Sequence, residues 1–421
     1  MRPNLIPDLD LAEHLFNMLR LRTFDGVGIT REAYGPGERT AHAIVAAEAE
    51  ALGLDVEADP AGNLLMTMPG TDPTLPRVVI GSHLDSVPQG GNYDGAAGVL
   101  AGLATVSGLR RAGFRATRDI TVIAIRAEEG GAWFPTSFPG SRAALGTLPP
   151  AALETKRLDS GRTLAEHMAE EGFLPEQVRA GTSLLRPADV AAYVELHIEQ
   201  GPVLDAEQIP VGIVTGIPGA RRLRAARVLG EYNHSGATPR RYRRDAAIAL
   251  AELASKLDDR WAELDAEGHA LVATFCVLAT APEAGFTKIA GEAHFQLDVR
   301  SVAPASVDAM FAALHALVPQ IEARRGVTFD LGAEVATTPT PMHPEVRAGL
   351  AQAATALGVK FREMASGGGH DAVAFAQAGV PAGMLFVRNQ HGSHNPHEAM
   401  RAEDFASATT VLMRWAAEVA K

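Results

Sequence analysis

The sequence predicts an α/β fold in which a mostly parallel sheet is covered by helices, with a smaller α+β domain inserted into the chain. At 421 residues the chain exceeds one ordinary hydrophobic core, which favours two domains. Short apolar runs alternate with helical patterns up to about residue 213 and again after residue 337, as in a parallel sheet. Residues 214–337 instead follow the order strand–helix–strand–strand–helix–strand, which is typical of a ferredoxin-like sandwich. We therefore expect a discontinuous main domain, 1–213 with 338–421, and an inserted domain, 214–337.

The individual elements are predicted from their hydrophobic spacing. In the main domain, apolar residues at helical spacing predict helices at 10–22, 38–52 and 94–109. Short apolar runs predict strands near Val56 and at 63–68, 78–80, 119–125, 190–196 and 381–387. In the inserted domain, the same criteria predict strands at 222–230, 270–280, 292–301 and 327–335, and helices at 245–261 and 306–324.

The composition excludes several classes of protein. The chain is 47% hydrophobic and 21% charged and has no apolar tract of about 18 residues, so no transmembrane helix is expected. The formal net charge of −12 argues against a nucleic-acid binder. The first residues lack the continuous apolar region of a signal peptide, and the single cysteine, Cys276, excludes an internal disulfide. These features favour the cytoplasm, and the apolar run around Cys276 favours packing over nucleophilic chemistry.

Polar side chains suited to metal binding follow four of the predicted strands. In α/β sheets, ligands bind just beyond the carboxyl ends of the strands. Imidazole and carboxylate ligands suit Zn²⁺, Mn²⁺, Co²⁺ or Ni²⁺, and two such ions about 3.5–4 Å apart can stabilise a tetrahedral oxyanion. A single strand-end histidine more often makes an ordinary hydrogen bond, but the convergence of four strand ends favours a metal site. The candidates are His83 with Asp94, Glu128 with Glu129, His197, and His394.

Five motifs occur in order along nearly the whole chain. They are Gly-Ser-His-Leu-Asp at 81–85, Gly-Gly-Asn-Tyr-Asp-Gly at 90–95, Glu-Glu-Gly at 128–130, Leu-His-Ile-Glu-Gln-Gly-Pro at 196–202 and Ser-His-Asn-Pro at 393–396. Together they resemble the M20-type metallohydrolases, and more narrowly the amidase/carbamoylase branch. This branch contains N-carbamoyl-L-amino acid hydrolases, β-ureidopropionase and allantoate amidohydrolase. The narrower resemblance rests on the fourth motif, because peptidase members usually have a carboxylate at the position of His197.

The resemblance implies two divalent metal ions in each subunit. One ion would be held by His83, Asp94 and His197. The other would be held by Asp94, Glu129 and His394, so that Asp94 bridges the two ions. Zn²⁺, Mn²⁺, Co²⁺ and Ni²⁺ are the candidate metals.

The resemblance also implies that Glu128 is the general base, which takes a proton from water and later delivers it to the leaving nitrogen. Asp85 would orient the His83 imidazole, since residues two apart share a face of an extended chain. The alternative for Asp85 is a plain turn cap. Adjacent strand residues point to opposite faces, so a local twist or turn is needed to direct both Glu128 and Glu129 inward.

The motif Asn-His-Ser-Gly-Ala-Thr-Pro at 233–239 resembles the family's lid motif. The resemblance implies that the inserted domain is a lid and dimerisation domain, and that the protein is a homodimer. His234 would reach the partner subunit's active site and donate a hydrogen bond to the carbonyl oxygen in the transition state. Considered without the resemblance, His234 is more simply interpreted as a turn histidine.

The substrate contacts are also implied by the resemblance. Arg300 would pair with the substrate carboxylate, which a guanidinium can bind through two parallel hydrogen bonds. Gln200 would contact the ureido or amide group. Gly367 and Gly368 would present backbone N–H groups to the acid end of the substrate. For His370, in the same loop, a supporting hydrogen bond and a catalytic role both remain open.

One departure from the family's pattern concerns substrate identity. The branch commonly has Asn-Val-Ile-Pro-Gly shortly before the strand with the arginine, and that asparagine touches the substrate. This chain has Phe-Thr-Lys-Ile-Ala-Gly at 286–291. Thr287 therefore takes the place of the asparagine as the candidate substrate contact, and Lys288 adds a cation nearby.

Eight arginines gather in one part of the inserted domain. Aromatic residues among them are scarce, and the whole chain is acidic, so a nucleic-acid face is disfavoured. We interpret the cluster as a solvated or subunit-interface surface, with attraction of an anionic substrate as the alternative. Its members are Arg221, Arg222, Arg224, Arg227, Arg240, Arg241, Arg243 and Arg244.

The expected function is hydrolysis of the carbamoyl or ureido C–N bond of a small N-carbamoyl amino acid or ureido acid such as allantoate, with release of ammonia and carbon dioxide. An aminoacylase or dipeptidase reaction on the same scaffold is the first alternative, and His197 together with Gln200 argues against it. A non-catalytic small-molecule binder is the second alternative, and the presence of all five candidate ligands with Glu128 argues against it. An interaction protein working through the arginine cluster is the third.

Overall fold

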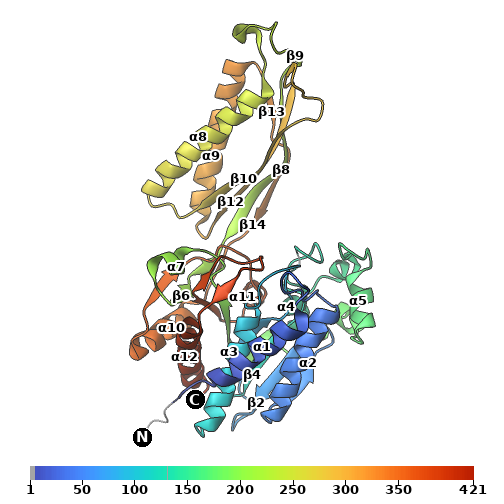
Figure 1. Cartoon of the computed structure of the whole chain (residues 1–421). Helices are drawn as coiled ribbons and strands as arrows, with labels where there is room; N and C mark the ends of the chain where they lie inside the picture. The colour runs from blue at the N-terminus through green and yellow to red at the C-terminus, as the bar shows by residue number, and fades with distance from the viewer. Residues whose placement is uncertain (1–4, 130) are drawn as a thin grey trace. The chain divides into compact units, whose positions relative to one another are not determined.

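A computed structural model describes residues 5–129 and 131–421 (Figure 1). The chain divides into two compact units. The large unit contains the chain up to Thr215 and from Pro341 onward, and the small unit is Gly216–Thr340. The expected boundaries, after residues 213 and 337, precede these by two and three residues.

An eight-stranded sheet forms the centre of the large unit. Its strands lie in the order β1 (Asp55–Ala58), β2 (Leu64–Met68), β4 (Ile120–Ile125), β3 (Arg77–His83), β5 (Val190–Ile198), β17 (Ala382–Val387), β6 (Val211–Val214) and β16 (Phe361–Met364). The four central strands β4, β3, β5 and β17 are parallel, whereas the pairs β1–β2, β2–β4 and β17–β6 are antiparallel. The predicted α/β class is therefore confirmed, and its parallel part lies where the site residues are.

Helices pack against this sheet and against one another. The α-helices of the large unit are α1 (Leu9–Thr23), α2 (Pro36–Ala51), α3 (Ala96–Arg111), α4 (Pro139–Ala144), α5 (Leu164–Glu170), α6 (Pro175–Arg179), α7 (Val203–Glu207), α10 (Pro344–Leu357), α11 (Ala372–Gln377) and α12 (Ala402–Val419). Short elements complete it: η1 (Pro150–Glu154), η2 (Pro187–Asp189), β18 (Asn389–Gln390) and β19 (Ala399–Met400).

Helix α3 approaches the central strands more closely than most helices could. A Cβ atom at Gly98 would lie 2.2 Å from the carbonyl oxygen of Leu196 on β5, so only glycine fits there. The small residues of α3 are buried along almost its whole length. This close packing holds the loop that precedes α3, with Asp94, beside the ends of β3 and β5.

The small unit has a ferredoxin-like order of elements. They are β8 (Gly219–Leu229), α8 (Ala246–Ala266), β10 (Val272–Thr280), β12 (Glu292–Ser301), α9 (Pro304–Arg325), β13 (Thr328–Asp330) and β14 (Glu334–Thr337). The antiparallel sheet has the order β10-β12-β8-β13, with β14 also paired to β8. Helices α8 and α9 lie side by side on one face, where they share a core with alternate residues of the strands (Figure 1).

The last predicted strand of the small unit, 327–335, is wrong as a single element. It is divided into β13 and β14, which pair with β8 in the same register; the residues between them, which include Gly332 with a left-handed φ of 65°, interrupt the strand. The remaining short elements of the inserted region are β7 (Gly216–Ile217), β9 (Asn233–His234), η3 (Arg240–Tyr242), β11 (Lys288–Ile289) and β15 (Thr340–Pro341).

The structure bears on two expectations from composition, one about membrane-spanning helices and one about Cys276. No α-helix among the described residues combines the length and the apolar character needed to cross a lipid bilayer. The packing role of Cys276 is contradicted, because its side chain is exposed on β10. The strand itself forms as predicted, but its pairing with β12 shifts register between Phe275 and Val277, and Cys276 lies at that irregularity.

Candidate metal centre and active site

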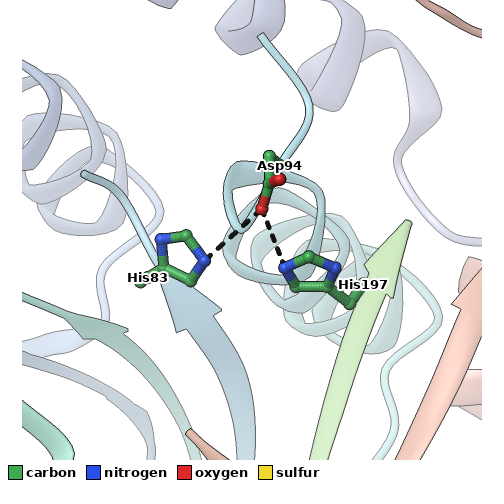
Figure 2. Close-up of side chains that lie close together, drawn as sticks. All are labelled: His83, Asp94 and His197. Carbon is green, nitrogen blue, oxygen red and sulfur yellow. Dashed lines mark ion pairs between the residues drawn. The ribbon is translucent and has the colours of Figure 1, made fainter. Parts of the chain in front are cut away.

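Three buried residues form the first candidate metal cluster (Figure 2). His83 is the last residue of β3, His197 lies near the end of β5, and Asp94 lies in the loop before α3. Oδ1 of Asp94 is 3.0 Å from Nε2 of His197 and 3.6 Å from Nε2 of His83. The two imidazoles thus direct their Nε2 atoms to one carboxylate oxygen.

A second candidate cluster shares Asp94 with the first. Nε2 of His394 is 3.5 Å from Oδ2 of Asp94 and 3.4 Å from Oε1 of Glu129. Glu129 is buried, whereas the His394 side chain is half-exposed. The two oxygens of Asp94 therefore face different clusters, which is the arrangement of a carboxylate that bridges two cations.

The local charges perturb the titration of these groups. Burial raises the pKa of the Asp94 carboxyl, but the imidazoles of His197, His394 and His83 outweigh it and hold that pKa well below its usual range. Burial and the Asp94 charge raise the pKa of Glu129 to about 7. The hydrogen bond to Asp94 raises the pKa of His394 to about 9, against the effect of burial. Glu129 and His394 thus hold protons more tightly than usual, and a divalent cation would compete with these protons.

The hydrogen-bond pattern fits a divalent cation in the first cluster. Nδ1 of His197 lies 2.9 Å from the carbonyl oxygen of Ile198, and Nδ1 of His83 lies 3.1 Å from that of Asp85. An Nδ1–H donating to these carbonyls leaves the Nε2 lone pair directed at Asp94, as in metal-binding histidines. Oδ1 of Asp94 is buried and has no hydrogen-bond partner among the described residues. Oδ1 of Asp94 and the two Nε2 atoms thus converge on one position where a cation would give Oδ1 a partner, although Nε2 of His197 also accepts from the Gly95 N–H at 3.2 Å.

A third group that sequence reasoning did not identify lies behind His197. Glu195, His197 and His370 bring their ligand atoms within 4.8 Å of one another. Oε1 of Glu195 accepts a hydrogen bond from Oγ of Ser82 at 2.7 Å, and Oε2 accepts one from the Ala372 N–H at 2.8 Å. Because both oxygens of Glu195 already have donors, this group supports His197 and is a poor separate metal site.

Both adjacent glutamates turn toward the site just after β4. Asp85 accepts hydrogen bonds from the backbone N–H groups of Glu128 and Glu129, each at 3.0 Å. Its Oδ1 also lies 3.2 Å from Nδ1 of His83. The turn required by the sequence is provided by Ala127, whose φ of 56° is in the left-handed region. Asp85 therefore contacts the imidazole and also holds the turn.

Glu128 lies at the edge of the first cluster, with Oε2 3.8 Å from Nε2 of His83. Its side chain is almost completely buried. Burial raises the pKa of Glu128 well above its usual range, His83 opposes this effect, and the charge of Glu129 adds to it. A carboxyl group whose pKa is raised in this way holds a proton more tightly and can return it to a leaving group.

Gln200, expected only as a substrate contact, directly contacts two of the candidate metal ligands. Its Nε2 donates to Oδ2 of Asp94 at 2.8 Å and lies 3.4 Å from Nε2 of His394. The glycine loop is nearby, since a Cβ atom at Gly368 would lie 3.2 Å from Oε1 of Gln200. In that loop Oγ of Ser366 accepts from the Gly368 N–H at 3.1 Å.

His370 is placed by its neighbours in the large unit. Its Nε2 lies 2.9 Å from Oγ of Ser366, and its ring centroid is 4.5 Å from that of His197. Burial lowers the pKa of His370 well below its usual range, and the charge of His197 adds to this effect. A neutral ring packed against a candidate ligand favours the supporting role.

Sequence reasoning missed Glu398, a buried carboxylate next to Asp94. It accepts hydrogen bonds from the backbone N–H groups of Tyr93 at 2.9 Å and Asp94 at 3.2 Å, and from Oγ of Ser393 at 2.6 Å. Oγ of Ser393 also makes a hydrogen bond to Oδ2 of Asp94. The only hint in the sequence was its position, since Glu398 is a glutamate four residues after the candidate ligand His394.

Arg31 is a second missed residue, and it is completely buried. Its Nε donates to the carbonyl oxygen of Leu84 at 2.6 Å, and one of its terminal nitrogens lies 3.3 Å from Oδ1 of Asn92. The guanidinium thus ties together the two loops that contain Asp85 and Asp94. No local pattern marked it, because both partners lie more than fifty residues away in sequence.

The other candidate substrate residues lie in the small unit. His234 on β9 is opposite Lys288 of β11, and the Ser235 N–H donates to the carbonyl oxygen of Thr287 at 2.9 Å. Nδ1 of His234 accepts from two backbone N–H groups, at 3.0 and 3.1 Å, so its proton is on Nε2. Arg300 on β12 donates to Oδ2 of Asp298 from Nε at 3.1 Å.

Several members of the arginine cluster pair with acidic neighbours in the small unit. Arg222 donates to Asp298 at 3.1 Å, and Arg227 donates to Asp330 at 2.8 Å. Arg221 makes an ion pair with Glu334. These ion pairs neutralise part of the positive charge, which favours a solvated surface over a nucleic-acid face.

Comparison with known proteins identifies the relatives of this arrangement. The profile of Peptidase family M20/M25/M40 matches residues 79–418. The chain belongs to this family. The M20 resemblance predicted from the motifs is thereby confirmed, and the candidate clusters are groups that could hold a metal ion.

Individual M20 relatives narrow the comparison. The chain is 38% identical over 386 residues to an N-carbamoyl-L-amino acid amidohydrolase of Geobacillus stearothermophilus, covering 91% of this chain and 92% of that one. It is 32% identical to an allantoate amidohydrolase of Bacillus subtilis, covering 91% of each. A hydantoinase/carbamoylase family amidase from Burkholderia ambifaria has a similar structure, with a TM-score of 0.88 and 33% sequence identity. The match covers 99% of this chain and 98% of that one.

Proposed function

We propose that this protein is a binuclear metal-dependent amidohydrolase that cleaves the carbamoyl or ureido C–N bond of a small N-carbamoyl amino acid or ureido acid, such as allantoate. The observation that carries the proposal is the position of Asp94, whose two oxygens face two separate clusters beside Glu128. The names of the M20 relatives support the same bond and the same class of substrate.

The proposed ligands divide into two sets with one member in common. His83, Asp94 and His197 would hold one ion, and Asp94, Glu129 and His394 the other. When bound, the ions polarise the substrate carbonyl and acidify water. Nitrogen and oxygen donors suit Zn²⁺, Mn²⁺, Co²⁺ or Ni²⁺.

Glu128 is the proposed general base. It takes a proton from water as the water oxygen attacks the ureido carbonyl carbon, and it returns that proton to the departing nitrogen. The C–N bond breaks, ammonia leaves, and the resulting carbamic acid loses carbon dioxide to give the free amine. Burial supports this cycle by raising the pKa of Glu128, so that the group holds a proton well enough to deliver it. Asp85 keeps Glu128 in position through the backbone hydrogen bond.

The proposed substrate contacts come from both units. Arg300 pairs with the substrate carboxylate, and its contact with Asp298 supports a fixed guanidinium orientation. The rest of the substrate would be contacted by Gln200, Gly367, Gly368 and Thr287.

His234 donates a hydrogen bond from Nε2 to the substrate carbonyl oxygen as negative charge develops there. Nε2 carries the proton because Nδ1 already accepts two backbone hydrogen bonds. The lid role of the small unit, the homodimer and the cytoplasmic location belong to this proposal as predictions.

A substrate and metal screen tests the proposal. Metal-free protein would be supplied in turn with Mn²⁺, Zn²⁺, Co²⁺ and Ni²⁺ and assayed with N-carbamoyl-L-amino acids, allantoate, ureidopropionate, ureidoglycolate, N-acyl amino acids and dipeptides. We expect metal-dependent release of ammonia from a carbamoyl or ureido acid. Faster hydrolysis of an N-acyl amino acid or a dipeptide would instead establish the aminoacylase or peptidase alternative.

A Glu128→Gln variant tests the assigned base. The amide cannot accept the proton, so we expect kcat to fall by roughly 10²–10⁴-fold. Metal content should stay near that of the parent, because Glu128 is not a proposed ligand. A variant as active as the parent would refute the mechanism, and a protein that binds metal but hydrolyses none of the substrates would favour a non-catalytic binder.

A further inference from the structure

Four consecutive backbone N–H groups near the site each donate to a buried side chain. They belong to residues 126–129, which we call the carboxylate turn because it ends in Glu128 and Glu129. In chain order, the acceptors are Oδ1 of Asn63 at 2.9 Å, Oε1 of Glu38 at 2.8 Å, and Oδ1 and Oδ2 of Asp85 at 3.0 Å each. The conformation of the turn is therefore set by side chains from three other segments of the large unit.

The second residue of the carboxylate turn needs this support most. Ala127 has φ of 56°, a conformation that residues with a Cβ atom rarely adopt. The same conformation directs both glutamates inward, which an extended chain cannot do. Ala127 is buried, and its N–H has Glu38 as its acceptor. Loss of that acceptor would leave a buried donor unsatisfied in an already unfavourable conformation.

Glu38 itself is held by contacts that fix its carboxylate. It is completely buried in the first turn of α2. Its Oε2 accepts from one terminal nitrogen of Arg126 at 2.8 Å and from the Tyr34 N–H at 2.7 Å. The Arg126 guanidinium is also 4.7 Å from the ring centroid of Phe173. Glu38 thus connects the start of α2 to the turn through a paired and hydrogen-bonded carboxylate.

We propose that Glu38 is a positioning residue that acts through the Ala127 N–H to place the carboxylates of Glu128 and Glu129 for catalysis and metal binding. This inference rests on the proposed roles of those two glutamates. Glu38 touches neither substrate nor metal ligand in this assignment. Its effect is to stabilise the left-handed conformation from which both carboxylates reach the site.

The test separates this role from simple support of the fold. Glu38→Asp keeps the charge that pairs with Arg126 but withdraws its oxygens from the Ala127 N–H by about one bond length. Ala127→Gly removes the steric penalty of positive φ, because glycine adopts that conformation freely. The set contains the two single variants, their combination and a control. The control is Glu50→Gln, at an exposed position of the same helix.

Three experiments would be done on each variant: calorimetry of Mn²⁺ binding to the metal-free protein, steady-state kinetics for kcat and KM on the best substrate, and thermal unfolding. For Glu38→Asp we expect Mn²⁺ affinity and kcat each to fall by about 10–100-fold, with KM changed by less than about threefold. Addition of Ala127→Gly should recover at least about a third of the lost kcat and affinity on a logarithmic scale. Glu50→Gln should match the parent in all three.

Two results would overturn the inference. One is a folded Glu38→Asp variant with Mn²⁺ affinity and kcat close to those of the parent. The other is a loss that Ala127→Gly does not reduce, which would make Glu38 only a structural residue. Should Glu38→Asp not fold at the assay temperature, Glu38→Gln takes its place with the opposite expectation. Its Oε1 can still accept from the Ala127 N–H, so Mn²⁺ affinity and kcat should stay within about threefold of the parent, and a larger loss would count against the inference. If the parent itself binds no Mn²⁺, the proposed function fails rather than the role of Glu38.

Discussion

The two carboxylate oxygens of Asp94 have different surroundings. Oδ1 faces His83 and His197 and has no hydrogen-bond partner among the described residues, whereas Oδ2 accepts from Gln200 at 2.8 Å and lies within hydrogen-bond distance of Oγ of Ser393. Backbone hydrogen bonds to Glu398 hold the loop in this orientation. One residue thus connects both candidate metal positions, which makes its removal more damaging than that of any single histidine.

Metal stoichiometry should distinguish Asp94 from His394. Asp94→Asn is expected to lose both ions, because each cluster loses a carboxylate oxygen with its charge. His394→Ala should lose one ion and keep the other in the cluster with His83. Elemental analysis after dialysis against metal-free buffer measures this. His397→Ala, an exposed histidine of the same loop, should retain both ions, and equal losses in Asp94→Asn and His394→Ala would contradict a bridging Asp94.

A buried carboxyl outside the site predicts a pH effect on stability. Burial raises the pKa of Asp59 to about 6, although hydrogen bonds from Asn63 and from the backbone oppose it. The folded state therefore binds a proton more tightly than the unfolded state, and the contribution of Asp59 to stability falls as pH rises from about 4 to about 6.

Asp59→Asn lacks this titration. As pH rises from about 4 to about 7, the free energy of unfolding of Asp59→Asn should therefore increase by roughly 2–3 kcal/mol relative to that of the parent. Urea denaturation across that range measures the difference. Asp55→Asn, at an exposed position, serves as the control for removal of one negative charge. A constant difference for Asp59→Asn across the range would contradict the raised pKa.

Among the elements, the contact between α3 and the central strands determines the shape of the site. Gly95 caps the helix with φ of 65°, and a Cβ atom there would lie 2.4 Å from Cε1 of His83. The parallel strands β3 and β5 end beside this cap, so their last histidines meet the loop that contains Asp94. The element geometry requires glycine at this position both for its backbone and for lack of space.

A matched pair of glycine variants separates these two requirements. Gly95→Ala and Gly113→Ala both place alanine at positive φ, which costs roughly 1–2 kcal/mol, but a Cβ atom at Gly113 meets nothing within 4 Å. Gly113→Ala should therefore show only this cost in thermal unfolding, whereas Gly95→Ala should be destabilised further by overlap with the buried His83 ring. Only Gly95→Ala should lose most of its metal affinity and activity, because it displaces His83. Equal metal affinity in the two variants would contradict the close packing at the cap.

At the scale of the whole molecule, the metal clusters and the proposed substrate arginine lie in different compact units. The five candidate ligands and Glu128 are in the large unit, and His234 and Arg300 are in the small unit. A complete active site on this proposal requires groups from both. The resemblance to M20 lid domains further predicts that His234 serves the site of the partner subunit.

Subunit complementation tests that prediction. Glu128→Gln and His234→Ala homodimers should each have little activity. If His234 acts across the dimer, random reassortment after mixing forms some dimers with one intact site, and activity should rise to about a quarter of the parent's. Activity on the best substrate before and after mixing measures the gain. No gain despite subunit exchange, or full activity in a monomer, would contradict the role across subunits.

The sequence by itself determined the α/β class, the ferredoxin-like order of the small unit and the candidate metal residues. These features have local signatures. Apolar runs predict strands such as β3 and β5, and polar residues at their ends predict a site, because parallel strands end at one edge of a sheet. The motif around His197 narrowed the resemblance to one branch of the family. Local spacing also required a turn before Glu128.

The tertiary structure alone decided how these residues are held. Glu38 accepts from Ala127, 89 residues away, and Glu398 accepts from Tyr93, 305 residues away. Burial of Arg31 and exposure of Cys276 likewise depend on which segments become neighbours. Hydrophobic periodicity reports which face of an element is buried, but it contains no information on the distant polar group that satisfies a particular N–H. The supporting hydrogen bonds of the site therefore appear only when the chain is folded.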